Sequence, residues 1–193
     1  ATITTTDAAG NSASASDTES YTVDASTPSV AVAIVDASLN LADTQSQVTF
    51  TFSEAPLGFT AADISVSGGS LSGFTPTANP LVYTATFTAT AGLTGSGTVS
   101  VTAASYTNAA GNPGTAGGDT VAIDTVPPAP TITLATNITA DDIVNSAEAA
   151  GSITLTGVVG GDARAGDTVS LLVNGTSYTG LVAADLSFAI PVA

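Results

Sequence analysis

The tetrapeptide Ala8-Ala9-Gly10-Asn11 recurs as Ala109-Ala110-Gly111-Asn112, and this recurrence decides how the chain is divided. The residue before each copy is acidic in one case, Asp7, and its amide in the other, Asn108. The two copies are therefore offset by 101 residues (108 − 7). A repeat of this length predicts a chain built from units of about 100 residues.

A second pair of segments gives the same period. Val23-Asp24 followed by Pro28 matches Ile123-Asp124 followed by Pro128, at an offset of 100 residues (124 − 24). This period is too long for a solenoid repeat of about 20 to 50 residues. It matches a whole immunoglobulin-like β-sandwich, so we expect tandem Ig-like domains strung along the chain.

The residues between these anchors alternate between apolar and polar side chains, which is typical of half-buried strands. Thr fills many outward positions, where its β-branch suits a pleated surface. Asn174-Gly175 predicts a two-residue type I′ hairpin turn. Only Ala140 to Ala150 could form a short helix. Because every other patterned segment reads as a strand, the predicted fold class is all-β. The segments with the strand pattern include Val48–Phe52, Val82–Thr88, Thr98–Thr102 and Ile153–Leu155.

Two proline-containing stretches, Asp24 to Pro28 and Asp124 to Pro130, are the predicted joints, because proline interrupts a strand ladder and keeps a linker stiff. They divide the chain into three pieces. Residues 1–24 are the last strands of one Ig-like domain. Residues 25–124 are a complete domain, and residues 125–193 are the first part of another.

The third piece has no Ala-Ala-Gly-Asn segment of its own, whereas the first piece ends as a domain should end. We therefore predict that a segment like residues 1–24 completes residues 125–193. The completing segment could belong to the same molecule, a neighbouring molecule or a longer parent chain. Open strand edges tend to pair with another copy, so homotypic strand pairing is an expected interaction.

The charge balance is strongly acidic. The 16 Asp and Glu residues face one basic side chain, Arg164, with no Lys or His, for a formal net charge of −15. Self-repulsion on that scale opposes a compact state. Hydrophobic residues nevertheless make up 44 % of the chain, too many for a disordered acidic tail. One arginine cannot neutralise a phosphate backbone, so no nucleic acid partner is expected.

The missing positive charge predicts a bound divalent cation. Calcium takes roughly six to eight oxygen ligands from carboxylates, Asn side chains and backbone carbonyls. Zinc, copper and iron prefer His or Cys, and the sequence has neither. Magnesium stays possible but prefers stricter octahedra. No EF-hand loop or glycine-rich nonapeptide is present, so the ligands of the expected Ca2+ have to converge from distant loops.

Candidate ligands are the carboxylates near predicted strand ends and joints. Each of them taken alone also fits a turn residue that bonds its own backbone, so the prediction rests on the collective charge. The candidates are Asp7, Asp24, Asp36, Glu54, Asp63, Asp119, Asp124, Asp141, Asp142, Glu148, Asp162, Asp167 and Asp185.

Several segments resemble a known family. Thr51-Phe52-Ser53-Glu54-Ala55, Tyr83-Thr84-Ala85-Thr86-Phe87 and Asn108-Ala109-Ala110-Gly111-Asn112 are similar to the bacterial Ig-like extender repeats of giant RTX-type adhesins. Residues 138–167 resemble a second repeat type from the same adhesins. Together these resemblances cover nearly the whole chain.

The resemblance implies a chain exported by a type I system to the surface of a Gram-negative bacterium. In such adhesins calcium stiffens the joints between neighbouring repeats, so that the extender projects a distal binding domain. Asn108 departs from the pattern of the other copy, where Asp7 stands, which removes one charge and weakens or remodels that site. The ligand candidates that the resemblance implies are Asp7, Asn11, Asp24, Asn112 and Asp124.

Three other functions compete with a structural spacer. A glycosidase needs two carboxylates about 5 to 9.5 Å apart, but without His or Cys other catalytic groups are scarce, so we expect no enzyme. A carbohydrate-binding module usually presents aromatic platforms, and this chain has no Trp, 4 Tyr and 6 Phe. A self-assembling matrix fibre joined by strand addition is the third alternative.

No apolar run approaches the roughly 20 residues of a spanning helix, so we expect this segment not to insert into a membrane. No basic and then apolar leader marks the start, and we expect an interior piece of a longer chain.

Overall fold

The structure is a computed structural model that describes all residues, 1–193. Every regular element is a β-strand except one 3₁₀ turn, Ala61–Asp63, which confirms the all-β prediction. The chain separates into two compact units, Ala1–Val126 and Pro127–Ala193, which are described here one at a time. The structure contains no helix with the length and apolar character needed to cross a membrane.

A hairpin opens the first unit. β1 (Thr2–Thr6) and β2 (Ser12–Ser16) pair with each other and with no other strand. Every residue of both strands is exposed, because their Thr, Ser and Ala residues offer no broad apolar face. No strand follows until Val30. That residues 1–24 are the last strands of a sandwich therefore stays a prediction.

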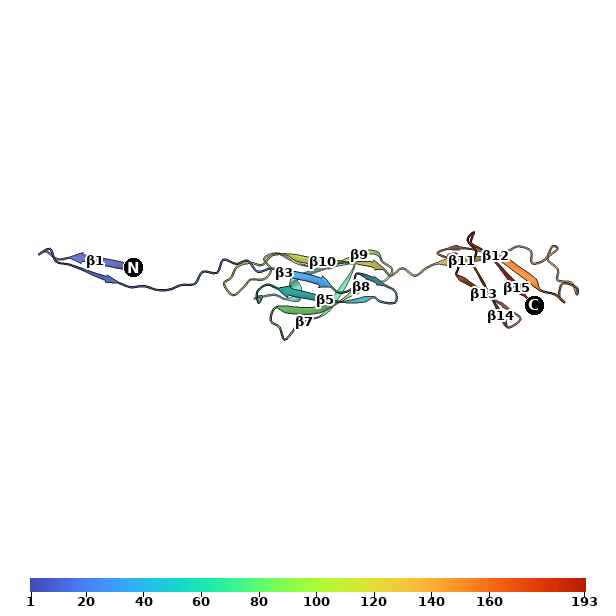
Figure 1. Ribbon diagram of the computed structural model, residues 1–193, viewed down its shortest axis with the longest axis horizontal. Coiled ribbons are helices and arrows are strands. Elements are labelled where there is room, and N and C mark those ends of the chain that lie inside the picture. Colours follow the sequence, from blue (N-terminus) through green and yellow to red (C-terminus); the bar gives the residue numbers. More distant parts are fainter. The chain divides into compact units, whose positions relative to one another are not determined.

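Residues 30–124 form a two-layer β-sandwich (Figure 1). One sheet has the strand order β3-β5-β8-β7 and the other has the order β4-β10-β9-β6. Neighbouring strands are antiparallel except β10, which runs parallel to β4. The strands are β3 (Val30–Ile34), β4 (Ser38–Asn40), β5 (Gln45–Phe52), β6 (Ile64–Ser67), β7 (Gly69–Pro76), β8 (Val82–Ala89), β9 (Thr94–Val101) and β10 (Gly117–Asp124).

The core of the sandwich follows the alternation of the sequence. In β5 every second residue is buried, and Val48 and Phe50 are fully enclosed. Phe59 enters the same core from the loop after β5, which no strand periodicity predicts. Its ring centroid lies 4.8–6.1 Å from those of five other rings, mostly edge to face, a geometry that aromatic pairs favour. These rings are Phe50, Phe52, Phe74, Tyr83 and Tyr106.

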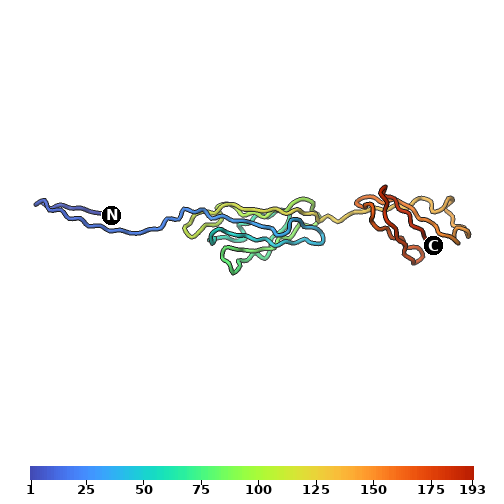
Figure 2. The backbone as a smooth tube through the Cα atoms, viewed as in Figure 1, coloured from blue at the N-terminus to red at the C-terminus, as the bar shows by residue number.

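The strands run lengthwise, so the loops of the sandwich gather at its two ends (Figure 2). Residues 53–63, 77–81 and 102–116 lie at the end where the chain enters, beside Ser29. Residues 35–44 and 90–93 lie at the opposite end, where Thr125 leaves β10 and bonds the backbone of Gly92 and Leu93. Each joint of the chain is thus next to one set of loops.

The second unit has one three-stranded sheet and one hairpin. β11 (Pro130–Leu134), β12 (Ile153–Gly161) and β15 (Ser187–Val192) form the sheet in the order β11-β12-β15. β13 (Thr168–Val173) and β14 (Thr176–Leu181) form the hairpin. Its buried core contains only Val169, Val182, Phe188 and Ile190. This pairing of β11, β12 and β15 repeats that of β3, β5 and β8 in the first unit.

Two local expectations have opposite outcomes. The turn between β13 and β14 is Asn174-Gly175 with φ of 47° and 81°, which confirms the type I′ prediction. The helix expected over Ala140 to Ala150 is wrong, because this segment forms turns. The carboxylate of Asp142 accepts the Ile138 N–H, and Asp142 itself has φ of 59°. Such local side-chain bonds compete with helix formation.

Candidate functional site

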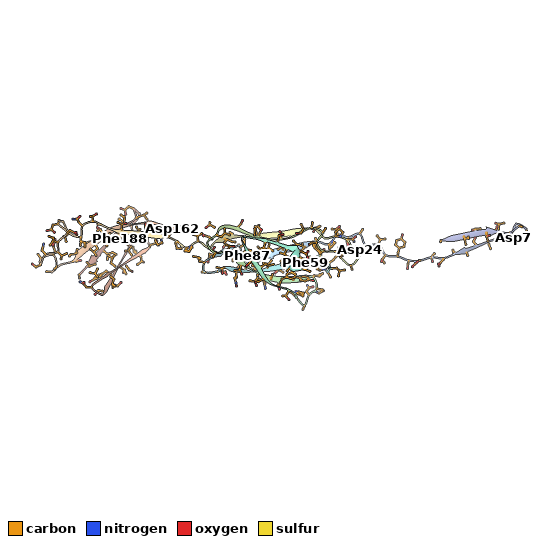
Figure 3. The ribbon with its side chains drawn as sticks, turned by 180° about the vertical axis from the view of Figure 1, so that it is seen from behind. Asp7, Asp24, Phe59, Phe87, Asp162 and Phe188 are labelled. Carbon is orange, nitrogen blue, oxygen red and sulfur yellow. The ribbon has the colours of Figure 1, made fainter.

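Two carboxylates converge where the chain enters the central sandwich. Asp24 precedes β3 and Glu54 follows β5, and because these strands pair antiparallel, with Val30 opposite Phe52, the two residues lie at the same end. The hydroxyl of Ser26 lies 2.9 Å from Glu54 Oε1 and also contacts Asp24 Oδ1. Figure 3 places Asp24 at this end of the sandwich, with Phe59 inside it.

A buried amide bridges the same two carboxylates. Asn108 is 1 % exposed, and its Nδ2 donates to Asp24 Oδ2 at 3.2 Å and to Glu54 Oε2 at 3.0 Å. Its Oδ1 accepts the N–H groups of Ala110 and Asn112. Backbone N–H groups can only donate, so they determine which way the amide points. The NH2 group of Asn108 therefore faces both carboxylates and bonds one oxygen of each.

Asp24 is held by donors from three residues, Ser26, Asn108 and Asn112. The Ser26 side chain, and then its backbone N–H, keep the pKa of Asp24 below its ordinary value. Asn112 Nδ2 donates to the Asp24 backbone oxygen at 2.9 Å. The two Ser26 donors favour the ionised form of the carboxyl, so Asp24 remains an anion at neutral pH.

The cluster offers hard oxygen donors, which suit Ca2+, but few of them. No group of three or more acidic, His or Cys side chains lies close enough to hold a metal ion. Asp24 and Glu54 are two carboxylates, whereas calcium takes roughly six to eight oxygens. The donor type fits, and backbone oxygens, water or a neighbouring segment would have to supply the remainder.

The loop that holds Asn108 has the same geometry as the loop that holds Asp7. Asp7 Oδ1 accepts the N–H groups of Ala9 and Asn11, as Asn108 Oδ1 accepts those of the corresponding residues. Gly10 and Gly111 have φ of 90° and 87°. The Asn11 side chain is the main cause that lowers the pKa of Asp7. The two copies thus differ in one atom, an acceptor oxygen in Asp7 and a donor nitrogen in Asn108.

Residues 24–126, or 103 of the 193 residues, match the sequence family of bacterial Ig-like domains. The chain belongs to that family. This confirms the immunoglobulin-like fold expected for this part of the chain. None of the functionally curated proteins matches the chain in sequence.

Two solved structures resemble the whole Ig-like chain. One is a Ca2+-stabilized adhesin that helps an Antarctic bacterium reach out and bind ice, with 29 % identity and a TM-score of 0.62. The other is a 1.5-MDa bacterial ice-binding adhesin, with 31 % identity and a TM-score of 0.52. All of this chain is covered in both, but it spans 47 % and 62 % of those chains. The resemblance to Ig-like repeats of large adhesins is confirmed.

The second joint of the Ig-like chain repeats part of the first. Asp124 Oδ1 accepts the Val126 N–H at 3.3 Å, as Asp24 Oδ1 accepts the Ser26 N–H at 2.9 Å. Thr94 Oγ1 also donates to Asp124. In the second unit, Asp162 Oδ2 accepts the Ala129 N–H at 2.7 Å. Each predicted joint therefore has an Asp that bonds the backbone two residues further on.

Most other candidate ligands bond their own loops. Asp63 caps its 3₁₀ turn by accepting the Thr60 N–H, and Asp167 accepts the Arg164 N–H. Glu148 accepts the Asn145 N–H, while Asp36 is half-buried and its own N–H donates to Ser46. Asp141 and Asp142 accept the N–H groups of Ile143 and Ile138. As calcium ligands all of these residues stay predictions.

The sequence did not predict that Ser26 and Asn108 contact the carboxylates of the site. Asn108 was expected only as a lost charge, and its use as a bridging donor depends on the loop that buries it. Ser26 carries a weak local signal, because Asp-x-Ser is a pattern in which the carboxylate bonds the residue two positions on.

Proposed function

We propose that this chain is a calcium-stiffened spacer segment of a large bacterial surface adhesin, outside the cell, with a structural and not a catalytic role. The observation that carries the proposal is the resemblance of the whole chain to two such adhesins, one of them described as Ca2+-stabilized. Neighbouring Ig-like repeats of the same chain are then its main partners.

The joint residues suit this role. Ser26 and Asn108 bring the carboxylates of Asp24 and Glu54 together at the end where the chain enters the central domain, which on this proposal is a joint between repeats. A bound Ca2+ would supply positive charge to a chain whose formal net charge is −15. Crosslinking both sides of a joint restricts its bending, which is the property that a spacer needs.

The rival functions find less support. The aromatic rings of the central domain pack against one another in its core and are not a platform for sugar rings. The carboxylates of Asp24 and Glu54 lie at the domain end and are bridged by the Ser26 hydroxyl and the Asn108 amide, an arrangement that suits a structural joint. A carbohydrate-binding module would need an exposed aromatic platform, which these core rings do not provide.

The proposal predicts that calcium raises the stability of the central domain and lengthens the particle. The measurements are thermal unfolding and small-angle X-ray scattering of residues 1–193, in millimolar calcium and in chelator. We expect a rise in Tm of at least roughly 4 °C, which corresponds to about 1 kcal/mol in a domain of this size. The double variant Asp24→Asn, Glu54→Gln should lose most of this rise.

A matched control is Asp17→Asn, Glu19→Gln, which removes the same two charges from an exposed segment with no strand. It should keep the calcium response of the parent chain. If neither Tm nor particle length responds to calcium, the proposed stiffening is wrong. An equal loss in both double variants would assign the effect to net charge and not to the joint.

A further inference from the structure

The turn between β13 and β14 exposes a reactive pair of residues. Asn174 is the one asparagine of the chain that glycine follows, and both Asn174 and Gly175 are exposed at the tip of this hairpin (Figure 1). No hydrogen bond holds the Asn174 side chain or the Gly175 N–H. The side-chain amide of Asn174 and the next backbone nitrogen are therefore both free to react with each other.

Most of the other asparagine side chains are held by hydrogen bonds. Asn11, for example, donates to the Asp7 carboxylate at 2.9 Å, and Asn145 accepts the Ala147 N–H at 2.9 Å. A held amide cannot turn its carbon toward the following nitrogen without losing its bond. The asparagines held in this way are Asn11, Asn40, Asn79, Asn108, Asn112 and Asn145.

Asn137 is the closest comparison for Asn174, because it is also exposed and its side chain is also free. The residue that follows it is Ile138, whose N–H donates to Asp142 Oδ1 at 3.1 Å. The side chain of Ile138 also branches at Cβ, which crowds its own backbone nitrogen. Only Asn174 combines a free amide, a free N–H on the next residue and a next residue without a Cβ.

We propose that Asn174 is a site of spontaneous deamidation, which alters the second unit as the protein ages. The Gly175 nitrogen attacks Cγ of Asn174 and gives up its proton, while Nδ2 takes up a proton and leaves as ammonia. Water then opens the resulting five-membered ring at one of its two carbonyl carbons. One opening gives an aspartate, and the other gives an isoaspartate, in which the backbone runs through the side-chain carbons.

The hairpin tip permits this ring closure. Gly175 has no side chain to obstruct its nitrogen, and glycine adopts backbone angles that other residues avoid. Asn174 and Gly175, with φ of 47° and 81°, lie outside the strand pairs, the last of which joins Val173 to Thr176. The two residues can therefore change shape while the strands stay paired.

The two products should differ in their effect on the second unit. An aspartate keeps the turn, because Asp also tolerates a positive φ. An isoaspartate adds one carbon to the backbone, and the length of the loop sets the register of a hairpin. Val169 of β13 is one of the four buried core residues of this unit, and Leu171 and Tyr178 pack against that core. A disturbed register should therefore loosen the second unit and leave the central domain unchanged.

The test is incubation of residues 1–193 at physiological temperature, in neutral and in mildly alkaline buffer, followed by peptide mapping with mass spectrometry. Asn174 should convert at least about tenfold faster than Asn137, because Gly175 leaves its nitrogen open and Ile138 does not. Both aspartate and isoaspartate should form. The rate should rise with pH, because the attacking nitrogen has to lose its proton.

Calorimetry of the aged chain tests the structural consequence. The fraction that carries isoaspartate should show a Tm for the second unit that is lower by at least roughly 4 °C, with the Tm of the central domain unchanged. The matched control is Asn174→Gly, because a Gly-Gly pair also favours a type I′ turn and has no amide carbon to attack. Its Tm values should stay constant during the same incubation.

Three results would overturn the proposal. The first is conversion of Asn174 that is no faster than that of Asn137. The second is an isoaspartate form whose second unit unfolds like that of the fresh chain. The third is an equal loss of stability in Asn174→Gly, which would assign the change with age to another part of the chain.

Discussion

At position 108 one amide nitrogen lies between two carboxylates and bonds both. Asn108 can do this because two backbone N–H groups hold its oxygen and leave its nitrogen facing Asp24 and Glu54. The corresponding Asp7 has an oxygen at that place, and its neighbour Asn11 supplies the donor. A single nitrogen or oxygen atom thus decides whether this loop attracts anions or cations.

We predict that Asn108→Asp makes the central domain dependent on calcium. The new carboxylate is buried beside two others and loses the donor contacts to Asp24, Ser26 and Glu54, so we expect the free energy of unfolding in chelator to fall by roughly 2 to 4 kcal/mol. Millimolar calcium should restore most of this loss. Urea unfolding with and without calcium measures both quantities.

The control for this substitution is Asn79→Asp. Asn79 uses only its oxygen, which accepts the Leu81 N–H, so an Asp can replace it in place. Its stability should change little in either condition. If Asn108→Asp is destabilised equally with and without calcium, the residue at this position does not select between an amide bridge and a metal.

At the scale of the elements, β3 and β10 belong to different sheets and meet along one side of the sandwich. Their contact includes the bond from the Ile34 N–H to Asp119 Oδ2, across 85 residues of sequence. Asp119 is therefore a carboxylate with a structural partner, although its position near a strand end made it a candidate ligand. A charged acceptor on an edge amide also blocks that edge from pairing with another strand.

Asp119→Ala should lower the free energy of unfolding by about 1.5 to 3 kcal/mol, the range for a hydrogen bond to a charged group. Asp119→Asn keeps one acceptor oxygen and should cost less. Urea unfolding of both variants separates loss of the bond from loss of the charge, and equal costs for the two would show that charge alone matters.

At the scale of the whole molecule, the two units have very unequal cores. The core cluster of the central domain has 16 buried residues, whereas that of the second unit has 4. Burial of apolar surface is the main source of stability, so the units should differ widely in their resistance to unfolding.

We predict two separate thermal transitions for residues 1–193 in dilute solution. Phe188→Ala should lower or abolish only the first, and Phe87→Ala should lower only the second, each by about 3 to 5 kcal/mol of unfolding free energy. Calorimetry of the two variants against the parent assigns the transitions. A single transition that both substitutions move together would mean that the units fold as one.

Local patterns predicted much of the fold. Alternation identified the strands around Val48–Phe52 and Val82–Thr88. The Asn174-Gly175 turn was predictable because Asn and Gly tolerate the positive φ angles that a type I′ turn requires. The helix predicted over Ala140 to Ala150 does not form, because local bonds such as that from the Ile138 N–H to the Asp142 carboxylate hold the backbone in turns. Which of these bonds form depends on the placement of a few individual atoms, which the sequence pattern does not record. Phe59 was invisible to periodicity because it reaches the core from a loop.

By itself, the sequence determined the all-β class and the period of about 100 residues, and it predicted the joints at Asp24 and Asp124 and a bound cation. These properties depend on composition and on spacing along the chain, which a sequence displays directly. Only the tertiary structure decided that Asn108 and Ser26 bridge Asp24 and Glu54, and that Asp119 serves β3. Those contacts join residues up to 85 positions apart, and their geometry depends on strand register and loop packing, which no local pattern records.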